Sequence, residues 1–143
     1  MGKFRLIAII LLVFFLYSRN VYAEENINIE IFDIRQEKVV KIVESNEAVE
    51  KIVLDYICQI DGFVAKCDPI PQEGYAIKVP LKSSRKIQNP WINGIVSEVI
   101  VVIPKEELGP FLVVFENGER FLCLNFKGSS DNLLKALGFQ AYH

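Results

Sequence analysis

The sequence predicts an α+β domain: a mostly antiparallel sheet of four or five strands, with one long amphipathic helix packed on a face and a short helix at the carboxyl end. Three observations predict this class. Several β-prone runs are separated by short turns, which join antiparallel neighbours. The stretch 45–62 changes to the spacing of an amphipathic helix. Asn117–Gly118 lies between two β-prone runs, as in a hairpin.

The first segment, 1–23, has the pattern of a secretory signal peptide. Two cations, Lys3 and Arg5, precede an unbroken apolar run over 6–17, and small residues lead up to Ala23. This order predicts export with cleavage after Ala23. An uncleaved anchor is the alternative, but a helix over the apolar run would span about 18 Å of a hydrocarbon core about 30 Å thick.

The remainder, 24–143, is long enough for a single globular α+β domain. Removal of 1–23 takes away three cations and no acid, so the net charge falls from −2 to −5. This acidic excess argues against nucleic-acid binding, which needs cations that displace counterions from phosphates. We therefore expect a secreted or extracytoplasmic protein of the cell envelope, with no stable transmembrane span after processing.

The elements follow from the periodicity. Alternating isoleucines predict a strand over 27–34, and 38–43 is either a second strand or the approach to a helix. Ser45 is expected to cap the long helix and Gly62 to end it. Its apolar stripe consists of Val49, Ile52, Val53, Tyr56, Ile57 and Ile60.

Three further runs are β-prone. The run over 75–81 contains Pro80, which favours an edge strand because proline lacks an amide donor. The run over 95–103 carries branched residues on both faces and predicts the most buried strand. In the hairpin over 110–126, a two-residue turn pairs Val114 with Phe121 and Leu112 with Cys123.

The carboxyl end predicts a short helix. Ser129 or Ser130 can cap it, and Gly138 ends it. Leu133, Leu134 and Leu137 form its apolar stripe. The complete order of elements is similar to cystatin-like folds, in which a helix lies on a curved sheet. This is a likeness of architecture and carries no function.

The chain has three cysteines, all after the predicted cleavage site. Cys58 and Cys67 lie at the predicted helix end and in the loop after it, close enough in sequence for an easy disulfide in an oxidising compartment. Two free thiols are the alternative, because spacing does not establish connectivity. Cys123 is expected to be a buried free thiol among apolar partners.

Catalytic signatures are weak. The single histidine is the last residue, His143, where an imidazole is badly placed for a hydrolytic triad, and no cysteine–histidine cluster predicts a zinc site. We predict no catalytic residues, no metal and no cofactor. Glu98, within the apolar run over 95–103, is the acid of most interest. A small hydrolase that depends on carboxylates is therefore an alternative function.

The stretch "SSRKIQNPWING" (83–94) is the candidate binding site. Its turn-forming residues place Trp91 on a connection between strands, where it either plugs the sheet end or serves as a contact anchor. Arg85, Lys86 and the preceding Lys82 make this connection cationic. The candidate binding residues are therefore Trp91, Arg85, Lys86 and Lys82, and the expected partner is a protein or an anionic envelope component.

The chain as a whole resembles small exported proteins of unassigned function from spore-forming Gram-positive bacteria. The resemblance lies in "IPQEGYAIKVPL" (70–81), "NPWINGIVSEVIVVIP" (89–104) and "PFLVVFENGERFL" (110–122). It implies an exported domain without an assigned activity. The function that we expect is a non-enzymatic binding or interaction module of the cell envelope, and a secreted protease inhibitor is a further alternative drawn from the likeness of architecture.

Overall fold

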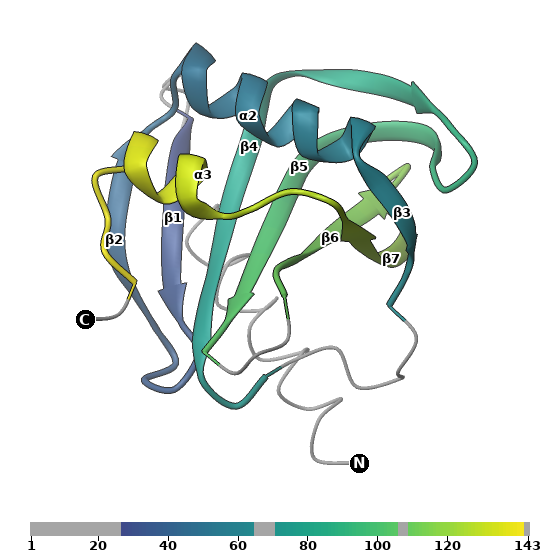
Figure 1. Ribbon diagram of the computed structural model, residues 1–143. Helices are drawn as coiled ribbons and strands as arrows, with labels where there is room; N and C mark the ends of the chain where they lie inside the picture. Colours follow the sequence, from purple (N-terminus) through teal and green to yellow (C-terminus); the bar gives the residue numbers. More distant parts are fainter. Residues whose placement is uncertain (1–26, 65–70, 106–108, 142–143) are drawn as a thin grey trace.

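The computed structural model describes residues 27–64, 71–105 and 109–141, which form a seven-stranded antiparallel sheet with two helices across one face (Figure 1). The strand order is β2-β1-β4-β5-β6-β7-β3. The elements are β1 (Asn28–Asp33), β2 (Lys38–Glu44), α2 (Glu47–Cys58), β3 (Ile60–Phe63), β4 (Gly74–Gln88), β5 (Asn93–Pro104), β6 (Phe111–Glu116), β7 (Arg120–Phe126) and α3 (Asp131–Ala136).

The predicted fold class is wrong in two respects: the sheet has seven strands, and the described residues contain no long helix. The longer helix, α2, has only 12 residues. Ile60 continues the apolar stripe in sequence, but it pairs with Phe126 as part of β3. A strand that directly follows a helix can place its apolar residue against the same core, so the spacing alone did not separate the two. The likeness to cystatin-like folds depended on the long helix and is not retained.

Both helices are fixed at their ends by local hydrogen bonds. The Asn46 side chain, one residue after the expected cap, accepts a hydrogen bond from the Val49 amide at 3.0 Å. At the end of α3, Gly138 adopts a φ of 62°. The amide of Phe139 then donates to the Leu134 carbonyl, which closes the turn as a Schellman motif. The Tyr56 hydroxyl donates to the Ser129 carbonyl at 2.6 Å and links α2 to the approach of α3.

The larger core lies between the sheet and the two helices. Its fully buried members include Ile29, Ile77, Val79, Val101, Leu112 and Leu124 from the sheet and Val49, Val53 and Leu133 from the helices. The opposite face of the sheet is also apolar. Its buried cluster consists of Phe32, Ile34, Ala76, Ile100, Val102, Phe111 and Val113, each at most 5% exposed. Strand β6 and the adjoining parts of β4 (74–81) and β5 (99–104) are therefore largely buried on both faces.

Pro80 does not mark an edge strand, as the sequence had predicted, because β4 lies between β1 and β5. The ladder with β1 ends at Lys78. The register with β5 shifts between Pro80 and Arg85. Pro80 therefore stands where the regular ladders on both sides of β4 stop, and its missing amide costs little there.

The β6–β7 hairpin is present, but its predicted register is wrong. Glu116 pairs with Arg120, so the turn contains three residues, and Val114 lies opposite Leu122. Asn117 and Gly118 adopt φ angles of 56° and 71°, the left-handed values of the two central residues of a type I′ turn, and the Glu119 amide donates to the Glu116 carbonyl at 3.1 Å. The third turn residue, Glu119, shifts the whole second strand by one position.

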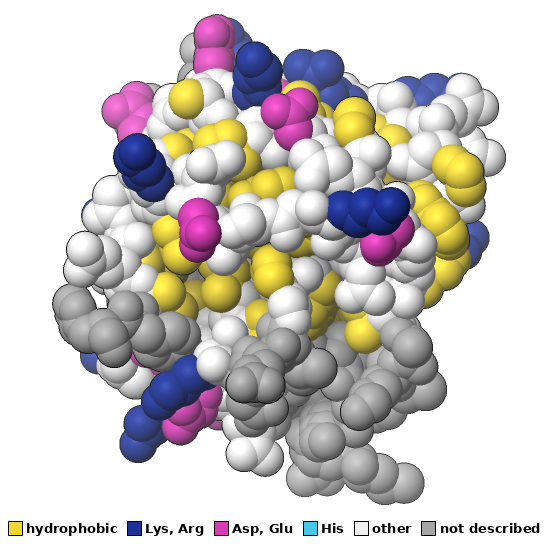
Figure 2. Space-filling view, viewed as in Figure 1, with side chains coloured by type: hydrophobic (Ala, Val, Ile, Leu, Met, Phe, Trp, Pro, Cys, Tyr) yellow, Lys and Arg dark blue, Asp and Glu magenta, His cyan; other side chains and the backbone are white. Residues whose placement is uncertain are grey.

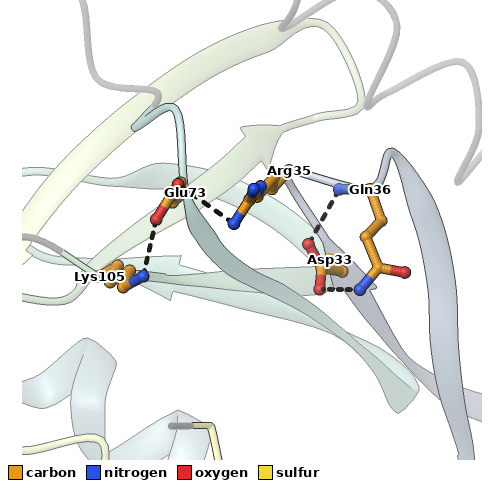
Figure 3. A network of polar contacts seen from close by, with 5 residues as sticks. All are labelled: Asp33, Arg35, Gln36, Glu73 and Lys105. Carbon is orange, nitrogen blue, oxygen red and sulfur yellow. Dashed lines mark hydrogen bonds and ion pairs between the residues drawn. The ribbon is translucent and has the colours of Figure 1, made fainter.

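The end of the sheet where β4 begins carries a small polar network (Figure 3). Glu73 contacts Lys105 at 3.0 Å and Arg35 at 3.6 Å. The hydrogen bond and the charge of Lys105 lower the pKa of the Glu73 carboxyl. The Asp33 carboxylate accepts two hydrogen bonds from Gln36, each of 3.0 Å. The partly buried bonds of Asp33 hold the β1–β2 turn, whereas the exposed ion pairs of Glu73 contribute little to stability.

Some of the predictions fall outside the described residues. These are the signal peptide over 1–23, Cys67 and His143, and they remain predictions. Within the described ranges, no helix is both long and apolar enough to cross a membrane.

Candidate functional site

A cleft of about 710 Å³ opens between the end of α2, β3 and the far end of the β4–β5 hairpin. It arises because β4 and β5 run past their neighbours and curl over beside α2 (Figure 1). The cleft is lined by Leu54, Ile57, Cys58, Ile60, Arg85, Lys86, Ile87, Gln88, Asn89, Pro90 and Trp91. Figure 2 shows the side of the molecule that faces the viewer in Figure 1, and hydrophobic side chains are exposed on its surface. We call this feature the hairpin cleft.

The loop that carries Trp91 is held by one side chain. The Asn89 carboxamide oxygen accepts hydrogen bonds from the amides of Trp91 at 2.8 Å and Ile92 at 2.7 Å. The Asn89 amide in turn donates to the Ile92 carbonyl at 2.9 Å. Ile92 is fully buried in the larger core. The loop is therefore anchored at its base and closed on itself, as an Asx turn is.

The β6–β7 turn supports the hairpin from the other side. A Glu116 carboxylate oxygen accepts a hydrogen bond from the Asn93 amide at 2.9 Å, and the Asn117 side chain accepts one from the Ile95 amide at 2.8 Å. These contacts require close approach at Gly94, where a Cβ would lie 2.7 Å from side-chain atoms of both residues. The hairpin end is thus fixed by neighbours before any ligand binds.

Trp91 combines the two roles that the sequence had left open. It is half-buried and packs against the larger core, and its ring meets Phe63 edge-on with centroids 5.5 Å apart. This contact joins the end of the β4–β5 hairpin to the edge strand β3. Trp91 therefore supports the sheet end with one part of its surface and lines the hairpin cleft with another.

The cleft is cationic within an acidic chain. The sequence contains 18 acidic residues, yet among the described residues that line the cleft two are cations and none is acidic. One of the cations, Arg85, contacts the nearly buried carboxylate of Glu50 at 3.7 Å. The Lys82 amide donates to the same carboxylate at 3.3 Å. Glu50 therefore positions Arg85 at the rim of the cleft.

The structure brings together three of the four candidate binding residues. Arg85, Lys86 and Trp91 line the hairpin cleft, whereas Lys82 lines an adjoining hollow of about 400 Å³ beside the start of α2. The sequence analysis did not identify the opposite wall. Ile57 and Ile60 belong to the apolar stripe that the sequence predicts to face the core, and Leu54 is not part of that stripe. Nothing in the spacing of these residues shows that they also line an open cleft.

The described cysteines differ in exposure. Cys58 is exposed in the wall of the hairpin cleft and forms no disulfide with any described residue. Because Cys67 lies outside the described residues, its pairing with Cys58 stays a prediction. Cys123 is a free, half-buried thiol that packs against the cluster on the face away from the helices. Burial raises the pKa of the Cys123 thiol to about 11.

We expect Cys123 to resist alkylation in the folded protein. With a pKa of about 11, only about one thiol in a thousand is deprotonated at pH 8, and the thiolate is the reactive form. Iodoacetamide labelling followed by peptide mass spectrometry should show Cys123 modified slowly in buffer and rapidly in guanidinium chloride. Equal rates in the two conditions would contradict the buried position.

A second group of ionisable side chains lies on the sheet face away from the helices. Glu30 and Lys78 are direct cross-strand partners, and both are nearly buried. One Glu30 carboxylate oxygen has no hydrogen-bond partner in the described part of the chain. Burial raises the pKa of Glu30, the charge of Lys78 opposes this shift, and Glu98 adds to it. Glu98, which the sequence had singled out, is half-buried and influences Glu30.

This shift predicts a pH-dependent stability. A carboxyl group whose pKa is raised on folding binds more protons in the folded state than in the unfolded state, so stability falls as the pH rises from about 4.5 through the folded value. The neutral variant Glu30→Gln should lack this loss. The melting temperature of E30Q minus that of the wild type should therefore be more positive at pH 7 than at pH 4.

The matched control for this measurement is Glu44→Gln, which removes an exposed carboxylate from the edge strand β2. We expect its difference in melting temperature to change little over the same pH range. A flat difference for E30Q would show that the Glu30 carboxyl is not desolvated.

Within the described ranges, no cluster of three or more histidine, cysteine, aspartate or glutamate side chains could hold a metal ion. No protein-family model, curated protein or solved structure matches this chain. The arguments on function that follow therefore depend on the geometry and the charge of the hairpin cleft.

Proposed function

We propose that this protein is an exported, non-enzymatic binding module of the cell envelope, and that the hairpin cleft is its binding site. The observation that carries the proposal is that two cations, Arg85 and Lys86, line a preorganised cleft that is mostly apolar. The pattern of 1–23 supports the export part of the proposal.

The shape of the cleft supports binding of a small molecule or a side chain. Small-ligand sites are concave, mostly apolar and about 300–1,000 Å³ in volume, with a few placed polar groups. The hairpin cleft has about 710 Å³, and its described lining is mostly apolar with cations at one side. The Asn89 turn and the contacts from the β6–β7 turn hold this shape without a ligand, which lowers the entropic cost of binding.

A charge reversal with a matched control tests the site. Immobilised protein starting at Glu24 is exposed to fractionated envelope extract, and the retained components are compared between Lys86→Glu and Lys38→Glu. Lys86 lines the cleft, whereas Lys38 is an exposed cation at the start of β2. Both variants make the same change in net charge. The free energy of unfolding of each is expected to lie within about 1 kcal/mol of the wild-type value, because both side chains are exposed and the largest new interaction is the carboxylate that K38E places opposite Asp33.

The proposal requires that K86E loses a component that both K38E and the wild type retain. Equal retention by the two variants would show that the cleft is not the binding site. The export part is tested separately by the mass of the protein recovered outside the cytoplasm, which should match a chain that begins at Glu24. A full-length mass there would contradict cleavage after Ala23.

A further inference from the structure

We infer that the ligand of the hairpin cleft is a single-chain amphipathic carboxylate, a fatty-acid-like anion whose alkyl chain lies against the apolar wall and whose carboxylate meets Arg85 and Lys86. This inference rests on the proposed function, because it names the ligand class of the same site. The carboxylate distinguishes this ligand from a cationic amphiphile, the alkyl chain distinguishes it from a free phosphate, and its single chain distinguishes it from a membrane surface.

The apolar wall is contributed by three separate elements. Leu54 and Ile57 come from α2, Ile60 comes from β3, and Ile87 and Trp91 come from the β4–β5 hairpin. An unbranched alkyl chain suits such a wall, because it needs no hydrogen-bond partner along its length. Burial of its surface contributes roughly 25 cal/mol per Å². This wall therefore favours an apolar chain over a polar ligand such as inorganic phosphate.

The cationic side of the cleft favours a carboxylate. The Arg85 guanidinium contacts the Glu50 carboxylate at 3.7 Å while about half of its side-chain surface stays exposed. A guanidinium has five N–H donors, so Arg85 retains donors for a second carboxylate. Lys86 lines the same cleft and adds a second positive charge. A cationic headgroup would be repelled by these two charges. No acidic side chain among the described lining residues would offset this repulsion.

Trp91 makes the inference testable with the unmodified protein. It is the only tryptophan in the chain and lies in the wall of the cleft, so its fluorescence reports on this site alone. Decanoate, added below its micellar concentration, should shift the emission to shorter wavelength and saturate. Decyltrimethylammonium and inorganic phosphate, titrated in the same way, should produce no saturable shift.

Two variants tie the signal to the cationic side. Lys86→Glu should weaken decanoate binding about tenfold or more, about 1.4 kcal/mol, because it replaces a charge that attracts the carboxylate with one that repels it. Lys38→Glu makes the same change in net charge on β2 and should bind as the wild type does. Equal weakening by both variants would indicate a general charge effect and would overturn the assigned headgroup contact.

The remaining outcomes separate the ligand class from the proposed function. A saturable response to decyltrimethylammonium equal to that of decanoate would overturn the assignment of an anion. A shift with vesicles of anionic phospholipid but not with decanoate would replace the free ligand by a membrane surface. If decanoate fails while envelope retention is still lost in K86E, the ligand class is wrong and the proposed site stands. If decanoate binds and K86E retains every envelope component, the proposed function is wrong instead.

Discussion

Replacement of Gly74 by alanine should destabilise the protein by roughly 2–6 kcal/mol, because it combines backbone strain with overpacking, each of which costs about 1–3 kcal/mol. Gly74 opens β4 with a φ of 141°, a conformation that side-chain-bearing residues rarely adopt. A Cβ at this position would lie 2.3 Å from the Ile103 carbonyl oxygen and 2.9 Å from the Cα of Pro104. Both are backbone atoms of the neighbouring strand β5, so neither can move without disturbing the ladder.

The effect of this change should spread to β1. The Gly74 carbonyl accepts a hydrogen bond from the Ile34 amide at 3.0 Å, so displacement of Gly74 loosens the contact between β4 and β1 as well as that between β4 and β5. Urea unfolding monitored by circular dichroism measures the free energy of unfolding. A typical domain has only 5–15 kcal/mol in total, so G74A should lower the midpoint strongly or prevent folding at 37 °C.

The same substitution at Gly62 is the matched control. A Cβ built at Gly62 meets no atom within 4 Å. Gly62→Ala in β3 should therefore change stability by no more than about 1 kcal/mol, and reduced entropy of the unfolded chain favours the alanine variant. A similar loss in both variants would mean that the glycine content of the strands matters and that the close approach at Gly74 does not.

The sequence predicted local elements better than their limits and partners. Periodicity located the region of α2 because residues three and four apart share a helix face. It could not locate the helix end, because Ile60 is apolar in either conformation and packs against the same core from β3. The register of the β6–β7 hairpin failed for a similar reason: Asn117–Gly118 suits both a two-residue and a three-residue turn, and the choice depends on the pairing of Glu116 with Arg120.

The candidate site was predicted on one side only. Trp91, Arg85 and Lys86 lie within one stretch of seven residues, so turn chemistry and charge could place them together on one connection. The opposite wall comes from α2 and β3, which reach the hairpin only because the sheet curls until Phe63 meets Trp91. That curvature depends on pairings between residues far apart in the chain. Local spacing therefore carries no information about the cleft.

Replacement of Phe32 by alanine should cost about 3–5 kcal/mol, the usual penalty for truncation of a buried aromatic residue. Phe32 is fully buried in the cluster on the sheet face away from the helices. The sequence had led us to expect cover on only one face, and under that expectation the second face would tolerate alanine. The measurement is again the free energy of unfolding in urea, in which loss of one ring should lower the midpoint without changing the slope.

Phe63→Ala is the matched control for this prediction, because it removes the same ring from a position that is 46% exposed. Its expected cost is about 1 kcal/mol, from the lost edge-on contact with Trp91 at 5.5 Å. A large loss for F32A with a small one for F63A would establish that the sheet carries a core on each face. A small loss for both variants would mean that solvent reaches Phe32 and that the helix-covered face alone stabilises the fold. Phe32 and Ile31 point to opposite faces of the sheet, and the face that carries Phe32 would then be exposed to solvent. The raised pKa of Glu30, which lies on the same face as Phe32, would lose its physical cause, which is burial.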